Sequence, residues 1–171
     1  MVEYQRKDRY DINDLRDIMS ILRSPQGCPW DREQIHKSIR NDFIEEVYEA
    51  IEAIDLEDTE LLKEELGDVL LQIIFHCRIE EEKSCFDFDD ICDELCKKLI
   101  IRHPHVFGDI TVSDSGEVLK NWDSIKKETK GQTSYTETLT SVAKSLPALM
   151  RAQKVGKRAM RAGMDFSCVS D

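Results

Sequence analysis

Two long segments with a helical pattern of apolar residues lie close together in the sequence, over residues 31–55 and 59–82. In both segments apolar side chains recur every three or four residues, as they do on one face of an α-helix. Only the short loop DLEDT separates the two patterns, so the second helix is expected to return antiparallel to the first. Such a hairpin limits the chain to a small set of helical folds.

Helix-breaking residues are scarce throughout the chain, which contains seven Gly and four Pro among 171 residues. Apolar periodicity predicts further helices over about residues 11–23, 88–101, 115–129 and 137–162. The helix ends carry recognisable signals, namely the capping-box patterns Asp31-x-x-Gln34, Asp114-x-x-Glu117 and Ser134-x-x-Glu137, and a terminating Gly163. We therefore predict an all-α fold, an antiparallel helical bundle.

The length of the chain suits one domain with one core. We expect residues 1–171 to form this single domain, with core helices over about 11–129 and a basic C-terminal helix over about 137–162. The six cysteines are irregularly spaced, which favours free thiols in a reducing cytoplasm over a disulfide framework. No apolar run approaches the length of a membrane span, and the N-terminus is polar and charged, so we expect no membrane partner.

Charge is distributed very unevenly along the chain, whose formal net charge is −11. Residues 42–94 contain 20 Asp and Glu but only 3 Lys and Arg, whereas residues 138–164 contain 6 Lys and Arg and no acid. An acidic protein repels polyanions, so no nucleic-acid partner is expected. The asymmetry suggests that the basic tail packs on an acidic surface, of this chain or of a partner.

Acidic residues flank the apolar stripes of the two central helices. A rotation of about 100° per residue places Phe43, Val47, Ala50, Ile51 and Ile54 on one face of the first helix. Glu46 and Glu49 fall beside that face, while Glu45 and Glu52 fall on the far side. In the second helix Glu65 and Asp68 lie beside an apolar centre formed by Leu66, Val69 and Ile73.

If the two flanks face each other, four carboxylates converge, and their mutual repulsion is costly while all are ionised. A hard divalent cation removes that cost, and oxygen ligands suit Mg²⁺, with Mn²⁺ as a possible substitute, better than Zn²⁺. Mg²⁺ in proteins often binds together with substrate phosphates. The spacing alone equally fits a solvated acidic stripe.

Several longer stretches resemble the MazG family of nucleoside triphosphate pyrophosphohydrolases. They are GCPWDREQ (27–34), EEVYEAIEAI (45–54), EELGDVLLQIIFH (64–76), KLIIRHPHVFGD (98–109), W-x-x-I-K (122–126) and LPALMRAQKVGKRA (146–159). The resemblance extends over nearly the whole chain from about residue 11, and is to the N-terminal half of two-domain members. It implies an all-α pyrophosphohydrolase that uses Mg²⁺ and forms a homodimer.

The resemblance also implies roles for individual residues. The family's metal motif, E-E-x-x-E followed by E-x-x-D, falls on Glu45, Glu46, Glu49, Glu65 and Asp68. The helical faces indicate that the last four are the metal ligands. Glu45 is therefore interpreted as a catalytic base or as a group that supports the ligands without binding the metal. The family's substrate-contacting positions fall on Lys98, Arg102, Trp122 and Lys126. The expected catalytic set is therefore Glu45, Glu49 and Lys98.

Three other classes of protein share some of these sequence features. A di-iron bundle needs two Glu-x-x-His motifs, and the chain has one, Glu33-x-x-His36. A zinc site could be formed by Cys92, Cys96, His103 and His105, although such cysteine pairs are usually buried thiols. A catalytically weak helical module that binds nucleotide or a protein partner also remains open.

The sequence therefore predicts a Mg²⁺-dependent enzyme that hydrolyses nucleoside triphosphates, NTP or dNTP, to the monophosphate and pyrophosphate. Such an activity serves house-cleaning or control of the nucleotide pool. Metal bound by the acids would polarise the triphosphate, Lys98, Arg102 and Lys126 would neutralise developing charge, and Trp122 would support the nucleotide.

Overall fold

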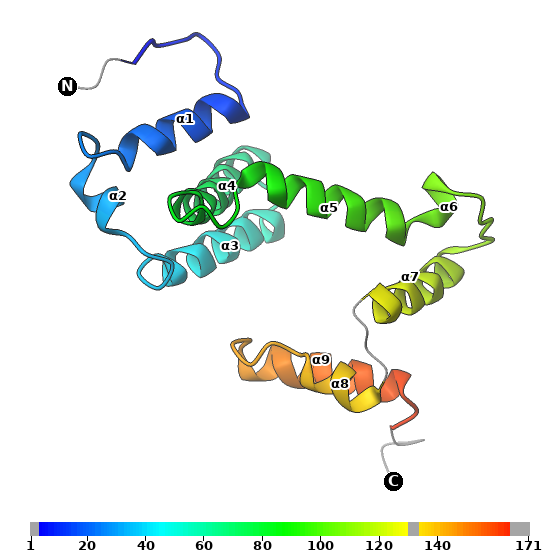
Figure 1. The fold of residues 1–171 in the computed structure, drawn as a ribbon. Helices are drawn as coiled ribbons and strands as arrows, with labels where there is room; N and C mark the ends of the chain where they lie inside the picture. Colours follow the sequence, from blue (N-terminus) through cyan, green and yellow to red (C-terminus); the bar gives the residue numbers. More distant parts are fainter. Residues whose placement is uncertain (1–3, 130–133, 165–171) are drawn as a thin grey trace. The chain divides into compact units, whose positions relative to one another are not determined.

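The computed structural model describes residues 4–129 and 134–164, apart from the side chains of residues 119, 120, 123 and 126–128. Every secondary-structure element in this part of the chain is helical, as predicted (Figure 1). The helices are α1 (Ile12–Leu22), α2 (Pro29–Glu33), α3 (Arg40–Asp55), α4 (Thr59–Glu81), α5 (Phe88–Arg102), α6 (Pro104–Phe107), α7 (Ser115–Thr129), α8 (Tyr135–Thr140) and α9 (Ala148–Arg161).

Tertiary contacts divide the chain into two compact units, residues 1–95 and 96–171, and α5 continues from the first unit into the second. Within the described residues, no helix is both long enough and apolar enough to cross a membrane.

The predicted hairpin forms the centre of the first unit. α3 and α4 lie side by side, and α1 packs on α4 (Figure 1). The side chain of Asp58 accepts hydrogen bonds from the backbone N–H groups of Glu60 and Leu61, which caps α4 after the short loop. The core of the unit is a cluster of five buried apolar residues, Met19, Ile39, Ile74, Phe75 and Ile79.

The predicted continuous helix over residues 31–55 is wrong in its first part. The structure has a short α2, a break at residues 34–39 and then α3. Asp31 is not the N-cap, because Pro29 occupies the first turn and starts α2 earlier. Gln34 has ψ 142°, an extended conformation that ends α2. Ile39, the last residue of the break, is almost fully buried in the core.

The prediction of which side of α3 and of α4 is buried is also wrong. Each helix is rotated about its own axis relative to the predicted orientation. Ala50 and Ala53 are the buried residues of α3, whereas Ile51 and Ile54 are 44% and 56% exposed. In α4 the buried set includes Gln72 and Phe75, and the predicted centre residue Leu66 is 53% exposed. Alanine side chains let two helices approach closely, and this close approach decides which faces meet.

Arg23 joins three parts of the first unit. Its guanidinium group donates to both carboxylate oxygens of Glu82, at 2.9 and 2.8 Å, and to the backbone carbonyls of Asp31 and Gln34. It also lies over the ring of Phe75, at 5.3 Å from the centroid. The side chain is 5% exposed, so these contacts replace water for a buried cation.

A second polar cluster attaches the break at residues 34–39 to α4. The Nδ1 atoms of His36 and His76 lie 2.7 Å apart, so one of them carries the proton that joins them. The Nε2 atom of His36 also binds the carboxylate of Glu80. Burial, and then the neighbouring His36, lower the pKa of His76. Hydrogen bonds from Lys83 and His36 lower the pKa of Glu80 to about 2.

Acid is expected to weaken this cluster and to lower the free energy of unfolding. The fold favours neutral His76, so the contribution of this residue is complete above its ordinary pKa of 6.5 and is lost as pH falls below that value. The fold also favours ionised Glu80, whose contribution is lost as pH falls from 4.5 towards 2.

Urea denaturation of the wild type and of His76→Gln at pH 7 and pH 5 measures the histidine part of this effect. The wild type is expected to exceed the variant in stability at pH 7, and the difference should shrink at pH 5. An equal difference at both pH values would contradict the assignment.

In the second unit several of the predicted helix ends are confirmed. The backbone N–H of Glu117 donates to Asp114 at 2.9 Å, and Ser134 and Glu137 form a reciprocal capping box. Gly163 follows the last helix with φ +73°, as expected for a terminating glycine.

The single helix predicted over residues 137–162 is instead two helices. α8 ends at Thr140, and α9 begins only after Pro147, which is its N-cap. Proline lacks a backbone N–H and disfavours helical geometry in the residue before it, so the helix is interrupted there. Arg158 of α9 binds the carbonyl of Thr138 and the hydroxyl of Ser141, which ties α9 to the end of α8.

Candidate active site

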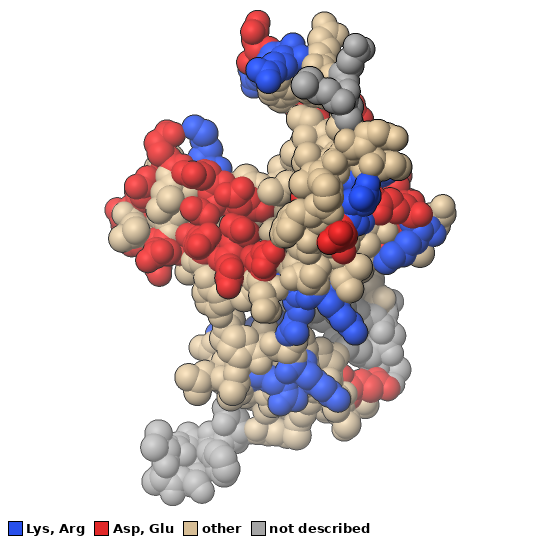
Figure 2. Space-filling view, turned by 90° about the vertical axis from the view of Figure 1, so that its left-hand side faces the viewer, with Lys and Arg blue, Asp and Glu red and all other residues tan. Residues whose placement is uncertain are grey.

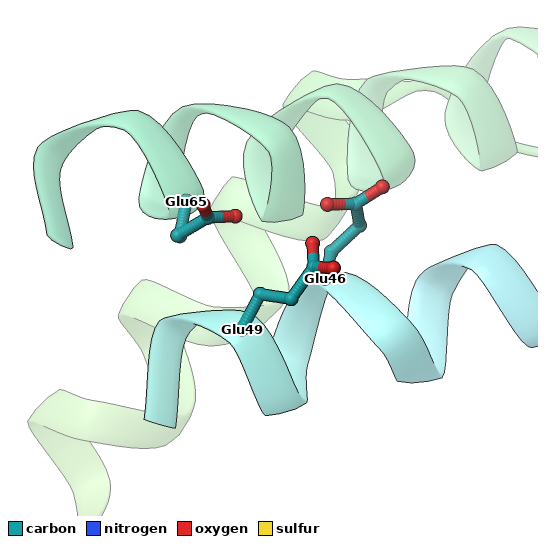
Figure 3. Close-up of side chains that lie close together, drawn as sticks. All are labelled: Glu46, Glu49 and Glu65. Atoms are coloured by element: carbon teal, nitrogen blue, oxygen red, sulfur yellow. The ribbon is translucent and has the colours of Figure 1, made fainter. Parts of the chain in front are cut away.

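Three glutamates converge in the space between α3 and α4. Glu46 and Glu49 are one turn apart on α3, and Glu65 lies on the facing side of α4, so the three carboxylates point towards one another (Figure 3). One potential ligand atom from each lies within 4.8 Å of the other two. Glu46 and Glu65 are partly buried, and Glu49 is exposed. We call these three residues the acidic cluster.

The acidic cluster is electrostatically unfavourable while it is fully ionised. Burial raises the pKa of Glu46, and the charges of Asp68, Glu49 and Glu65 raise it further. Burial also raises the pKa of Glu65, with Glu49 and Asp68 adding to the effect. For a carboxyl group a raised pKa means that the fold disfavours its charge, so stability falls as pH rises through the titration of Glu46 and Glu65.

The other two predicted acids lie at the edge of the acidic cluster. Asp68 is partly buried one turn after Glu65 on α4, and its charge acts on both Glu46 and Glu65. Asp68 does not belong to the group of ligand atoms within 4.8 Å. Glu45 is exposed on α3, as its position on the helical wheel indicated.

The donor set of the acidic cluster consists of carboxylate oxygens, which suits a hard cation such as Mg²⁺. Across the described residues, this is the one group of three or more Asp, Glu, His or Cys side chains with such close ligand atoms. The alternative zinc site of Cys92, Cys96, His103 and His105 is therefore not assembled in this part of the chain.

The segment that carries the acidic cluster is strongly acidic, because residues 42–94 contain 20 Asp and Glu but only 3 Lys and Arg. Figure 2 shows Asp and Glu side chains gathered over one part of the molecule, which agrees with the excess of acids in residues 42–94. A polyanionic substrate approaching such a surface is repelled unless bound cations neutralise it.

The predicted substrate-contacting residues lie in the second unit. Lys98 and Arg102 are one turn apart on α5, with Lys98 exposed and Arg102 partly buried. The guanidinium of Arg102 lies over the ring of Trp122 on α7, at 5.4 Å from the centroid. Lys126 also belongs to α7, but its side chain lies outside the described residues.

One contact in the second unit was missed by sequence analysis. The His103 ring meets the Trp122 ring edge to face, with centroids 4.9 Å apart and an interplanar angle of 72°. The signal in the sequence was Pro104, because the residue before a proline avoids helical geometry and α5 therefore ends next to His103.

Comparison with known proteins identifies the family. A family model described as the MazG nucleotide pyrophosphohydrolase domain matches residues 34–107, which contain α3, α4, α5 and α6. The chain is also 45% identical over 157 residues to a nucleoside triphosphate pyrophosphohydrolase of Escherichia coli (strain K12). The chain contains a MazG nucleotide pyrophosphohydrolase domain. The MazG match includes all five predicted acids together with Lys98 and Arg102.

Two further comparisons extend this result. An uncharacterized protein of Bacillus subtilis (strain 168), YabN, is 48% identical to this MazG chain over 148 residues. The crystal structure of a MazG-related protein from Thermotoga maritima matches with a TM-score of 0.57 and 25% identity, and covers 68% of this chain and 99% of that one.

The coverage of the longer relatives is only partial. The Escherichia coli match covers 91% of this chain but 60% of the relative, and the Bacillus match covers 86% of this chain but 30% of the relative. The chain therefore corresponds to part of each of these longer proteins.

Proposed function

We propose that this chain hydrolyses nucleoside triphosphates, NTP or dNTP, to the nucleoside monophosphate and pyrophosphate, with Mg²⁺ as the cofactor. The observation that carries the proposal is the acidic cluster, because it brings three carboxylates of a MazG domain together and carboxylate oxygens are the ligands that a hard cation prefers. The names of relatives such as the Escherichia coli protein support the same activity.

We propose Glu46, Glu49, Glu65 and Asp68 as the metal ligands. The raised pKa values of Glu46 and Glu65 support this assignment, because a bound cation would relieve the repulsion that causes part of the shift. When bound there, Mg²⁺ supplies neutralisation of triphosphate oxygens and a lower pKa for a coordinated water. Mn²⁺ also accepts carboxylate ligands and is expected to substitute.

The remaining roles fall to side chains outside the acidic cluster. Glu45, exposed one residue before Glu46, is proposed to orient the attacking water or take its proton. Lys98 and Arg102 are proposed to bind phosphate oxygens and neutralise charge as the bond breaks. Trp122 is proposed to stack on the base, with Lys126 as a further cation.

An assay of pyrophosphate release from the purified chain tests the activity directly. The substrates are a panel of NTPs and dNTPs with Mg²⁺, a parallel reaction contains EDTA, and the products are separated as monophosphate or diphosphate. We expect metal-dependent formation of monophosphate and pyrophosphate. Nucleotide and metal binding without turnover would instead support the second candidate function, a binding or regulatory module.

The substitution Lys98→Ala tests the proposed phosphate contact. A hydrogen bond to a charged group is worth about 1.5–3 kcal/mol, so kcat/KM is expected to fall about 10- to 100-fold. Lys97→Ala, the adjacent position on α5, is the matched control and should retain kcat/KM. Unchanged kinetics for Lys98→Ala would place the phosphate contact elsewhere.

We also propose that the chain forms a homodimer through the outer face of α3. Five apolar residues of this helix are exposed by 39–56%, namely Ile44, Val47, Tyr48, Ile51 and Ile54. They recur every three or four positions and form one row along the helix, and a contiguous exposed apolar surface is typical of a protein–protein contact. A second copy of the same face would bury this row symmetrically.

Light scattering coupled to size exclusion tests the dimer. The wild type is expected to elute with twice the mass of the chain, and Ile51→Glu should convert it to monomer because it places a charge in an apolar interface. Leu149→Glu, at an 86% exposed position on α9, is the control and should remain dimeric. A monomeric wild type would contradict the proposal.

A further inference from the structure

The end of α5 directs two consecutive side chains of the second unit at Trp122. Pro104 is the first residue of α6, so α5 stops at Arg102 and His103 becomes the N-cap between the two helices, with φ −122° and ψ 57°. Arg102 then lies over the Trp122 ring, and His103 meets that ring edge to face.

The orientation of the His103 ring is fixed from two sides. Its Nδ1 atom donates a hydrogen bond to the backbone carbonyl of Leu99 at 2.6 Å, so Nδ1 carries the proton. The ring of His105 lies 5.7 Å away at an angle of 57°. Edge-to-face contacts of this kind hold aromatic rings in defined orientations.

Arg102 is a cation without a carboxylate partner among the described residues. Its Nε atom is buried and makes no hydrogen bond there, although its guanidinium lies 5.4 Å from the Trp122 centroid. A partly desolvated cation of this kind favours an anionic ligand, since an anion supplies the missing partner. Arg102 and Trp122 therefore form one surface that can receive an anionic, aromatic ligand, and His103 contacts the Trp122 ring of that surface.

We propose that His103 is a positioning residue that holds Trp122 in the orientation needed to stack on the nucleotide base. This inference rests on the proposed function, because it assigns His103 to the same substrate. Stacking is tolerant of base identity, since every base has a π face. The contribution of His103 is therefore to affinity for nucleoside triphosphates as a class, without choosing among bases.

A simpler role for His103 would be to cap α5 through its hydrogen bond to Leu99. Two substitutions separate the roles. His103→Asn retains a donor near the position of Nδ1 and removes the ring, whereas His103→Phe retains the ring and removes the donor. Val106→Ala, at a 63% exposed position on α6, is the matched control.

The kinetic experiment measures KM and kcat for ATP, GTP, CTP and UTP with Mg²⁺. An edge-to-face pair contributes about 0.5–1.5 kcal/mol, so KM for His103→Asn should rise by up to about tenfold with kcat little changed. The increase should be similar for all four substrates. His103→Phe and Val106→Ala should remain close to the wild-type KM. A wild-type KM for His103→Asn would overturn the proposal and leave only the capping role.

A second readout does not depend on turnover. In a Trp30→Phe background Trp122 is the remaining tryptophan, because the chain has two. His103→Asn should lower the fluorescence anisotropy of Trp122 and shift its emission to the red, while His103→Phe should not. Absence of turnover in the wild type would contradict the proposed function, whereas unchanged fluorescence in His103→Asn would overturn the positioning role alone.

Discussion

Glu49→Gln is expected to reduce Mg²⁺-dependent hydrolysis by about 100-fold or more. Even the loss of a residue that only hydrogen-bonds to a metal ligand lowers metal affinity or activity by about 10- to 100-fold, and Glu49 is proposed as a ligand itself. Glu49 is the exposed member of the acidic cluster and raises the pKa of both Glu46 and Glu65. The neutral amide keeps the size of the side chain and removes one of the converging charges.

The same substitution is expected to stabilise the metal-free protein at pH 7. The fold disfavours the charges of Glu46 and Glu65 at that pH, and removing the charge of Glu49 relieves part of the repulsion. Thermal melts with and without Mg²⁺ measure both effects. Mg²⁺ should raise the Tm of the wild type and should raise that of Glu49→Gln much less.

Glu52→Gln is the matched control for this prediction. Glu52 lies on α3, three residues after Glu49, is exposed, and does not belong to the acidic cluster. It should therefore retain activity and its Mg²⁺-dependent shift in Tm. Full turnover of Glu49→Gln with Mg²⁺ would show that the metal assignment is wrong.

Arg23→Ala is expected to lower the free energy of unfolding by about 2–3 kcal/mol. Removal of one partner from a fully buried ion pair destabilises a protein by about 3–5 kcal/mol. The loss expected here is smaller, because Glu82 retains contact with solvent and with Arg78. The substitution also leaves the carbonyls of Asp31 and Gln34 without their donor. The break between α2 and α3 therefore loses an attachment.

Urea denaturation followed by circular dichroism measures this loss as a lower midpoint with an unchanged slope. Lys63→Ala removes an exposed ion pair with Glu60 on α4, and is expected to change stability by less than about 1 kcal/mol. If Arg23→Ala changed stability no more than Lys63→Ala, the anchoring role of Arg23 would be contradicted.

The breaks in the predicted helices show where local pattern was insufficient. The apolar periodicity of residues 31–55 continues through the break, because Ile35 and Ile39 satisfy a helical spacing. What interrupts the helix is distant in sequence: His36 binds His76 and Glu80, and Arg23 holds the carbonyl of Gln34. Such contacts leave no trace in the periodicity of the segment itself.

The rotation of α3 and α4 has a similar explanation. A helical wheel identifies the most apolar side, and on α3 that side contains Val47, Ile51 and Ile54. In the folded chain the alanine side packs on α4 instead, and the larger side chains remain exposed. A wheel cannot distinguish a face that packs within the chain from one that suits a second copy.

By itself the sequence determined the helical class, the α3–α4 hairpin and the family, because helical periodicity, a short loop and ordered motifs are local properties of the chain. It also placed acids at one-turn spacing on both helices. Only the tertiary structure decided that Glu46, Glu49 and Glu65 meet, that Arg23 and His36 hold the break before α3, and that His103 contacts Trp122. Those outcomes depend on how closely and at what rotation the helices pack, which is set by side chains far apart in the sequence.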